Sequence, residues 1–181
     1  GQTIKAVHVH STDNSTSNIF AVPAVDAAGT VYVTWAETQT KTSRVRYSFS
    51  SDHGTTWSRP VDVTATTDSA LLPWIAAAGA GEVVLAYYIS PGTPGDPGAL
   101  AGFWHAGVSH VTNANSIAPS LQHYVANQTA KHGAICVNGS GCTADRELGD
   151  YLGVHMSADR RIHVAWSDES YDAHWLLLEP S

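Results

Sequence analysis

Charged residues are scarce in this chain, and basic residues most of all. Lys and Arg together number 9, against 16 Asp and Glu among 181 residues, which gives a formal net charge of -7. No run of basic residues occurs, whereas binding to a phosphate backbone needs a clustered positive surface. The composition therefore argues against a nucleic-acid partner.

Long apolar runs are missing as well. No stretch approaches the roughly 20 apolar residues that a helix needs to cross a bilayer. The start of the sequence has no basic segment followed by an apolar one, the pattern of a signal peptide. We expect a soluble chain without a membrane span, from which any signal peptide has been removed or lies outside this sequence.

Cysteine is rare, and the placement of the two cysteines is informative. Cys136 and Cys142 enclose a short segment with two glycines, which is flexible enough to bring the two sulfurs together. A local disulfide would imply an oxidising compartment and hence a secreted, extracellular protein. The alternative is two free thiols or half of a metal site, although this spacing without a second cysteine pair is a poor zinc pattern.

Other metal and nucleophile patterns are also absent. His8 and His10 would share one face of a strand, but no further histidine pair or cysteine set completes a site. Asp13, Asn14 and Asp96 could offer oxygen atoms to calcium, yet the D-x-D-x-D-G spacing of a calcium loop does not occur. There is no G-x-S-x-G elbow for Ser-His-Asp catalysis. We expect no metal and no cofactor, with calcium as an open alternative that no motif supports.

Small, turn-forming and β-branched residues are plentiful. Apolar spacing at helical intervals is not sustained anywhere, whereas segments 31–35 and 162–166 are rich in β-branched and aromatic residues. Apolar residues make up 43% of the chain, which is enough for a real core. We predict an all-β fold, formed by a single domain over 1–181, in which any helix is short.

One unit recurs three times along the chain. It consists of a leading segment, a turn of small residues or Gly, and an alternating strand that ends in an aromatic residue, so each copy predicts a β-hairpin. The first two copies are about 50 residues apart, a period in the range of four-stranded propeller blades. The copies span residues 22–35, 72–87 and 151–166.

The third copy comes later than this period predicts. The extra length falls between Pro91 and about Cys142. The first part of this stretch, 91–98, is dense in Pro and Gly and cannot form a central strand or a helix interior. We therefore predict a Pro/Gly-rich insertion, or long surface loop, around 91–142.

A short motif lies between two strand-like runs, 43–49 and 59–63. It fits S-x-D-x-G-x-T-W at every defined position. The aspartate can accept hydrogen bonds from turn amides, the glycine permits positive φ, and the tryptophan supplies an apolar anchor. The motif resembles the Asp-box of sialidases and related bacterial neuraminidase repeats, and its residues are Ser50, Asp52, Gly54, Thr56 and Trp57.

This resemblance implies the four-stranded antiparallel blades of a sialidase-like β-propeller. In that family the Asp-box lies on the outer turn between the third and fourth strands of a blade, away from the active centre, so Asp52 is expected to be structural. The segments 146–153 and 166–168 also look like blades of secreted bacterial proteins of this kind. Three blades cannot close the ring of about six that is usual in the family. The chain is therefore expected to be a partial propeller: a fragment, a half that associates with another chain, or a truncated member of the family. A homo-oligomer would be one way to supply the missing half.

The resemblance does not carry over to a catalytic site. A sialidase would use three arginines, a tyrosine activated by a glutamate, and an aspartate, but no arginine here stands in the family's F/Y-R-I-P context. If a site exists, its candidates combine a guanidinium, carboxylates and a phenol around one predicted blade. They are Arg146, Glu147, Asp150, Tyr151 and Asp168. The alternative is that Asp150 and Tyr151 serve a turn and the core.

Two functions stay open, and with them the question of whether the protein is an enzyme. The function we favour is a secreted binding module that presents loops and aromatic residues to a glycan or protein ligand. The aromatic candidates are Trp74, Trp104 and Trp175. The alternative is a glycoside hydrolase of exo-sialidase type whose active site is completed by missing blades or by a second chain.

Overall fold

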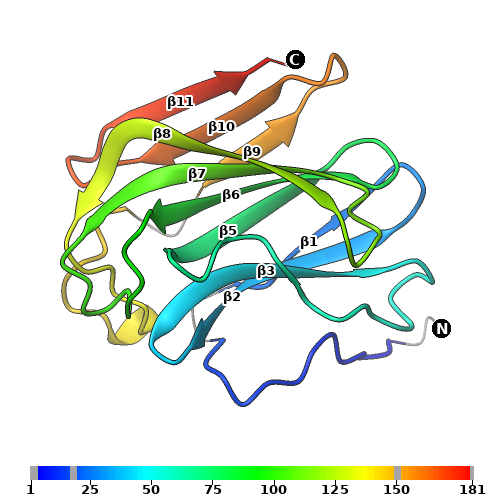
Figure 1. Ribbon diagram of the computed structural model, residues 1–181, viewed down its shortest axis with the longest axis horizontal. Helices are drawn as coiled ribbons and strands as arrows, with labels where there is room; N and C mark the ends of the chain where they lie inside the picture. Colours follow the sequence, from blue (N-terminus) through cyan, green and yellow to red (C-terminus); the bar gives the residue numbers. More distant parts are fainter. Residues whose placement is uncertain (1–3, 17–19, 149–151, 180–181) are drawn as a thin grey trace.

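The computed structural model describes residues 4–16, 20–148 and 152–179. Three antiparallel sheets lie one above another (Figure 1), the first two with four strands and the last with three. Within these residues the only helical element is the short 3₁₀ turn η1 (Gly139–Gly141), and no helix could cross a membrane. The all-β fold with antiparallel sheets of blade size is confirmed, and the sheets do not close into a ring.

The first sheet has the order β1-β2-β3-β4. Its first two strands form the first of the three predicted hairpins, closed by a turn in which Gly29 has φ +84°. The segment with the Asp-box-like motif joins its third and fourth strands. The strands are β1 (Val22–Val25), β2 (Val31–Gln39), β3 (Thr42–Ser50) and β4 (Val61–Asp62).

The second sheet, with the order β5-β6-β7-β8, lies between the other two. Its first two strands form the second predicted hairpin. Every residue of β6 is buried, because both faces of this sheet are covered. The strands are β5 (Ser69–Ala77), β6 (Glu82–Ser90), β7 (Phe103–Thr112) and β8 (Ser120–His132).

The structure corrects the insertion expected around 91–142. Within 91–142, the segments 91–102, 113–119 and 133–142 lie outside strands. The remaining residues form β7 and β8, which belong to the second sheet. The Pro- and Gly-rich segment 91–98 is a loop, as its composition requires. The extra length before the third hairpin is therefore a pair of long strands flanked by two loops.

The third sheet, with the order β11-β10-β9, contains the third predicted hairpin. Its strands are β9 (Gly153–Met156), β10 (Ile162–Ser167) and β11 (Ala173–Leu178). Trp175 on its outer face is 61% exposed. That another chain or further blades complete the partial propeller remains a prediction.

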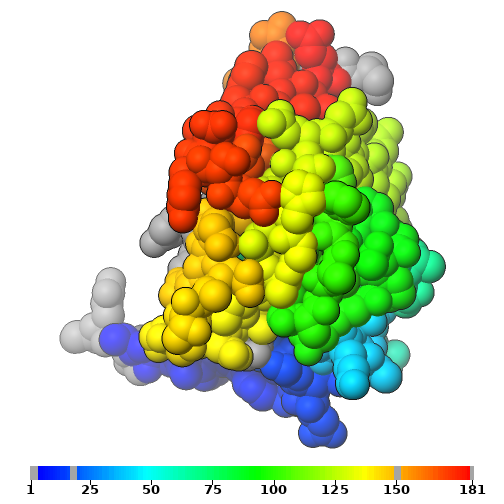
Figure 2. All heavy atoms as spheres, turned by 90° about the vertical axis from the view of Figure 1, so that its left-hand side faces the viewer, coloured from blue at the N-terminus to red at the C-terminus, as the bar shows by residue number. Residues whose placement is uncertain are grey.

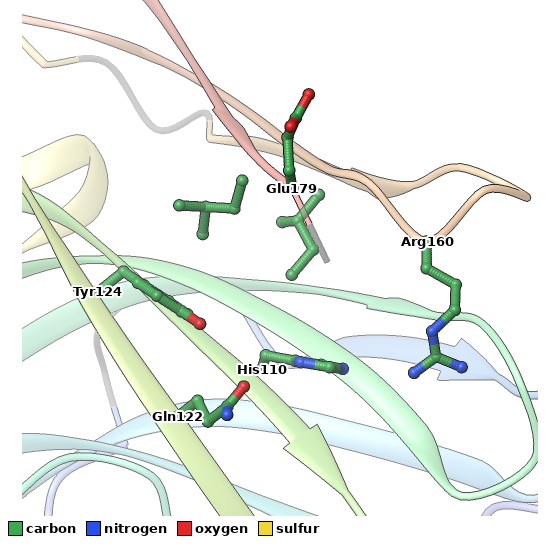
Figure 3. A pocket seen from close by; sticks show the side chains of 7 residues that line it. His110, Gln122, Tyr124, Arg160 and Glu179 are labelled. Atoms are coloured by element: carbon green, nitrogen blue, oxygen red, sulfur yellow. The ribbon is translucent and has the colours of Figure 1, made fainter. Parts of the chain in front are cut away.

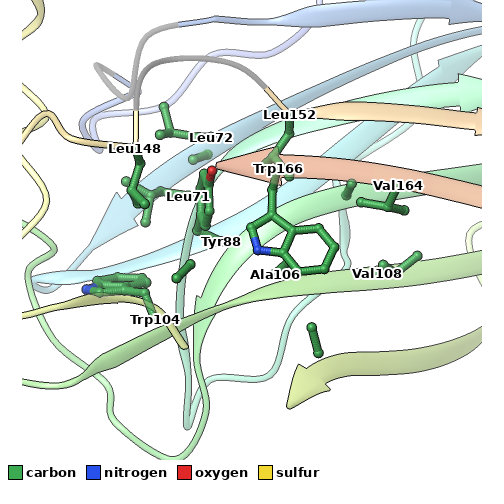
Figure 4. Packing of buried hydrophobic residues seen from close by; sticks show 14 of the residues in the cluster. Leu71, Leu72, Tyr88, Trp104, Ala106, Val108, Leu148, Leu152, Val164 and Trp166 are labelled. Atoms are coloured by element: carbon green, nitrogen blue, oxygen red, sulfur yellow. The ribbon is translucent and has the colours of Figure 1, made fainter. Parts of the chain in front are cut away.

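Two hydrophobic cores hold the three sheets together. Alternate residues of β6 supply both, since side chains on a strand point to opposite faces in turn. Leu85 and Tyr87 belong to the core shared with the first sheet. Val84 and Tyr88 belong to the core shared with the third sheet, where Figure 4 shows Tyr88 beside Trp166.

The three tryptophans predicted to face a ligand differ in exposure. Trp104 is fully buried in the second core and donates its indole N–H to the carbonyl of Gly133 at 2.8 Å. Its prediction as a presented aromatic is therefore wrong, because the strand that carries it is covered by the third sheet and its loops. Trp74 is half-buried and packs against the same core. Trp175 is exposed, as predicted.

Connections between antiparallel strands alternate between the two ends of a sheet, so the loops of this protein gather at two ends. We call one the turn end; it lies on the right in Figure 1 and carries the hairpin turns and the Asp-box-like segment. We call the other the loop end; it carries the longer loops and faces the viewer in Figure 2. The main loop-end connections are 91–102, 133–148 and 168–172.

Candidate functional site

The two longest loops of the loop end are fixed to each other. Ile135 donates its backbone N–H to the carbonyl of Pro97 at 2.8 Å, and Gly133 donates to Gly102 at 2.9 Å. Cys136 and Cys142 form the predicted disulfide. Loops held on a rigid sheet scaffold are common positions for binding residues, so this end is the natural place to look for a site.

A groove of about 370 Å³ lies along these loops; we call it the loop-end groove. Asp96 accepts the N–H of Gly98 with one carboxylate oxygen at 3.0 Å and lines the groove. Asn138, Thr143 and Asp145 add an amide, a hydroxyl and a second carboxylate. The remaining lining comes from Gly98, Cys136, Val137, Gly141, Cys142 and Ala144.

Lys131, at the end of β8, anchors the wall of this groove. Its ammonium is almost fully buried and lies 2.9 Å from a carboxylate oxygen of Glu147 and 3.7 Å from one of Asp145. A buried cation needs such partners, because burial removes its hydration. The hydrogen bond from Lys131 also lowers the pKa of Glu147. The sequence analysis did not identify Lys131. The one feature that could have pointed to it is a charged residue within a segment that forms a strand.

The described residues predicted for a catalytic site lie in two loop-end segments that both contact the end of β8. Glu147 does so through Lys131, and the β10–β11 turn does so through the N–H of Glu169, which donates to the carbonyl of Ala130 at 2.8 Å. Arg146 lies in the same loop wall as Glu147 and donates to the carbonyl of Gly139 at 3.0 Å. Asp168 lies in the β10–β11 turn and accepts two backbone N–H groups of that turn. Asp150 and Tyr151 lie outside the described residues.

Both described candidate carboxylates, Glu147 and Asp168, have a lowered pKa. His174 lies 2.8 Å from a carboxylate oxygen of Asp168, and this hydrogen bond, together with those of the turn amides, lowers the pKa of Asp168. Glu147 is held as a carboxylate by Lys131. These two residues stabilise a turn and a loop wall.

The Asp-box-like segment is found at the turn end, far along the sheets from the groove. Asp52 accepts hydrogen bonds from the N–H and hydroxyl of Thr56, at 2.8 and 2.7 Å, and from the N–H of Thr55 at 3.0 Å. The bonds from Thr56, followed by that from Ser50, lower the pKa of Asp52 to about 2. Gly54 adopts φ +83°. The carboxylate thus closes the turn between β3 and β4.

Comparison with known proteins gives little guidance. No family model matches the sequence, and no curated protein matches it. Among solved structures, the chain is similar to a leech intramolecular trans-sialidase complexed with 2,7-anhydro-Neu5Ac, with a TM-score of 0.43 and 11% identity. The match covers 88% of this chain and 23% of the trans-sialidase chain. The chain therefore spans about a quarter of that protein, and a similarity this distant assigns no activity.

Proposed function

We propose that the protein is a secreted carbohydrate-binding module and that the loop-end groove holds the glycan. The observation that supports this proposal is the groove itself, which is large enough for one or two sugar rings at about 370 Å³. Amide, hydroxyl and carboxylate groups on Asn138, Thr143 and Asp145 offer the donors and acceptors that sugar hydroxyls need. The disulfide and the ion pairs of Lys131 hold these groups in place before a ligand arrives.

The charges of the groove favour a neutral glycan. Asp96 and Asp145 are the two charged residues among its lining, and both are acidic. The ammonium of Lys131 is buried against carboxylates and is not free to receive an anion. The guanidinium of Arg146, in the same loop wall, donates to the carbonyl of Gly139. An acidic sugar would place its own carboxylate beside like charges, which costs binding free energy.

A glycan array tests this selectivity. We expect neutral glycans to give the signal and their sialylated counterparts to bind at least tenfold more weakly. Asp145→Asn should weaken the neutral signal by roughly tenfold, since a hydrogen bond to a charged acceptor contributes about 1.5–3 kcal/mol. Asp159→Asn, which changes an exposed aspartate of the turn end, is the matched control. Equal or tighter binding of the sialylated series would contradict the proposal.

The alternative function, an exo-sialidase, gives a different result in a simple assay. We expect no turnover of a fluorogenic sialoside by this chain, because none of its arginines stands in the F/Y-R-I-P context that the sialidase resemblance would require. Tyr151→Phe should therefore change nothing. Turnover that disappears in Tyr151→Phe would favour the hydrolase instead.

A further inference from the structure

A second, smaller cavity lies at the turn end, between the second and third sheets. Its volume is about 130 Å³, and we call it the turn-end cavity. His110 of β7 and Gln122 and Tyr124 of β8 form one side, as Figure 3 shows, while Arg160 approaches from the β9–β10 turn. The other lining residues are Ile162, Leu178 and Glu179.

A buried carboxylate holds the two basic groups of this cavity. One oxygen of Glu82, whose side chain is 8% exposed, lies 2.6 Å from Arg160 Nη2 and 2.7 Å from His110 Nε2. Arg160 reaches Glu82 from a backbone position with φ +66°, a region that non-glycine residues rarely adopt. The contact joins the second sheet to the third and fixes both side chains at the cavity.

The opposite wall offers polar groups that are not used elsewhere. Gln122 and Tyr124 are both exposed, and within the described part of the chain their amide and hydroxyl form no hydrogen bond. In Figure 3 the hydroxyl of Tyr124 is directed toward the ring of His110, and the side chain of Gln122 lies below that hydroxyl. Ile162 and Leu178 add apolar surface. The cavity therefore combines neutral donors and acceptors with an aromatic and an aliphatic wall.

From this arrangement we infer that the turn-end cavity binds a single neutral sugar ring or a polyol of similar size. An amide and a phenol can hydrogen-bond neighbouring hydroxyls, while an aromatic face packs against the C–H groups of a ring. An anion is disfavoured, because Glu82 already neutralises Arg160 and Glu179 adds a second carboxylate. The volume excludes a longer chain from the cavity.

An NMR titration of the ¹⁵N-labelled protein tests this inference. D-glucose, D-galactose and myo-inositol are the neutral probes, and acetate is the anionic one. We expect at least one neutral probe to shift the amide signals of residues 110, 122 and 124 in a saturable way, with acetate ineffective. Gln122→Ala and Tyr124→Phe should each weaken this binding at least fivefold. Tyr124→Phe removes only a hydroxyl that has no hydrogen-bond partner among the residues that the structure describes, so loss of folding is not the expected cause of its effect.

Two controls separate this site from the loop-end groove. Gln128→Ala, an exposed residue elsewhere on β8, should leave the titration unchanged. Asp145→Asn, which alters the groove, should also leave it unchanged. The inference is overturned if no neutral probe shifts these signals at 100 mM, if acetate shifts them more strongly, or if Tyr124→Phe binds as the unmodified protein does.

Discussion

Replacing Glu37 by glutamine is expected to destabilise the protein by about 3 kcal/mol at neutral pH. Glu37 lies on β2 with its side chain 1% exposed, and one of its oxygens lies 3.1 Å from Arg46 Nη1. It also accepts hydrogen bonds from Thr12 and Asn14, at 2.9 and 2.6 Å, and from Trp35. The carboxylate therefore ties the N-terminal segment to the first sheet, and the neutral amide cannot replace all of these bonds.

The effect of Glu37 should depend on pH in a defined direction. Burial alone would raise its pKa, but the hydrogen bonds from Asn14, Thr12 and Trp35, with the charge of Arg46, lower it from 4.5 to about 2. A lowered pKa contributes stability above the unfolded value, and this contribution is lost as the pH falls. The difference between Glu37→Gln and the unmodified protein should thus be full at pH 7, shrink below pH 4.5 and nearly vanish near pH 2.

Urea unfolding at a series of pH values measures this difference directly. Glu179→Gln is the control, because the side chain of Glu179 is 69% exposed and should contribute less than about 0.5 kcal/mol. Limited proteolysis should also cut the segment 4–16 faster in Glu37→Gln. A stability difference that stays constant from pH 7 to pH 2 would contradict the assigned role of Glu37.

Asp26→Ala is expected to cost about 3–5 kcal/mol, the second large effect. One oxygen of this buried carboxylate accepts the N–H groups of Ala28 and Thr30, both at 2.9 Å. The other accepts the hydroxyl of Tyr32 at 2.9 Å and the N–H of Gly81 at 2.7 Å. Since Gly81 belongs to the β5–β6 turn, Asp26 joins the first sheet to the second, and alanine would leave buried donors without partners.

The contribution of Asp26 to stability should also decrease as the pH falls, as that of Glu37 does. Burial would raise the pKa of Asp26, yet the hydrogen bond from Gly81 and those of its own turn bring it below the ordinary value of 3.8. Its contribution is therefore present above pH 3.8 and lost in more acidic solution.

Thermal and urea unfolding of Asp26→Ala should be compared with Asp159→Ala. Asp159 lies in the corresponding turn of the third sheet, but its side chain is 56% exposed, so its loss should cost less than about 0.5 kcal/mol. Equal effects of the two substitutions would show that Asp26 does not join the sheets as described.

The hairpins could be predicted from the sequence because their signals are local. The β1–β2, β5–β6 and β9–β10 pairs each follow from alternating residues around a turn of small residues. The sequence pattern did not predict β7, and the reason is physical. This strand contains Gly107, a poor strand former, where an added Cβ would come within 2.6 Å of the ring of Tyr87. This glycine is required by packing against the neighbouring strand, which no local pattern reveals.

The candidate site was harder to predict than the fold. Glu147 was chosen from the sequence, but its partner Lys131 lies in a strand that had been assigned to an insertion. Asp168 was chosen as a candidate because it follows the aromatic residue Trp166 at the end of a predicted strand. In the structure its carboxylate accepts two backbone N–H groups and closes the β10–β11 turn. The groove forms only where the loop of Asp96 meets the disulfide loop, a long-range contact. Residues with reactive or charged side chains could be found in the sequence, but the residues that they contact in the folded protein could not.

The most direct test of the proposed function maps where a neutral glycan binds. The neutral glycan that gives the strongest array signal should be titrated into ¹⁵N-labelled protein and followed by NMR. We predict saturable shifts at residues 96–98 and 136–145, around the loop-end groove, with none at the Asp-box-like turn, residues 50–57. Shifts confined to other surfaces, or none at saturating glycan, would contradict the assignment of the groove as the binding site.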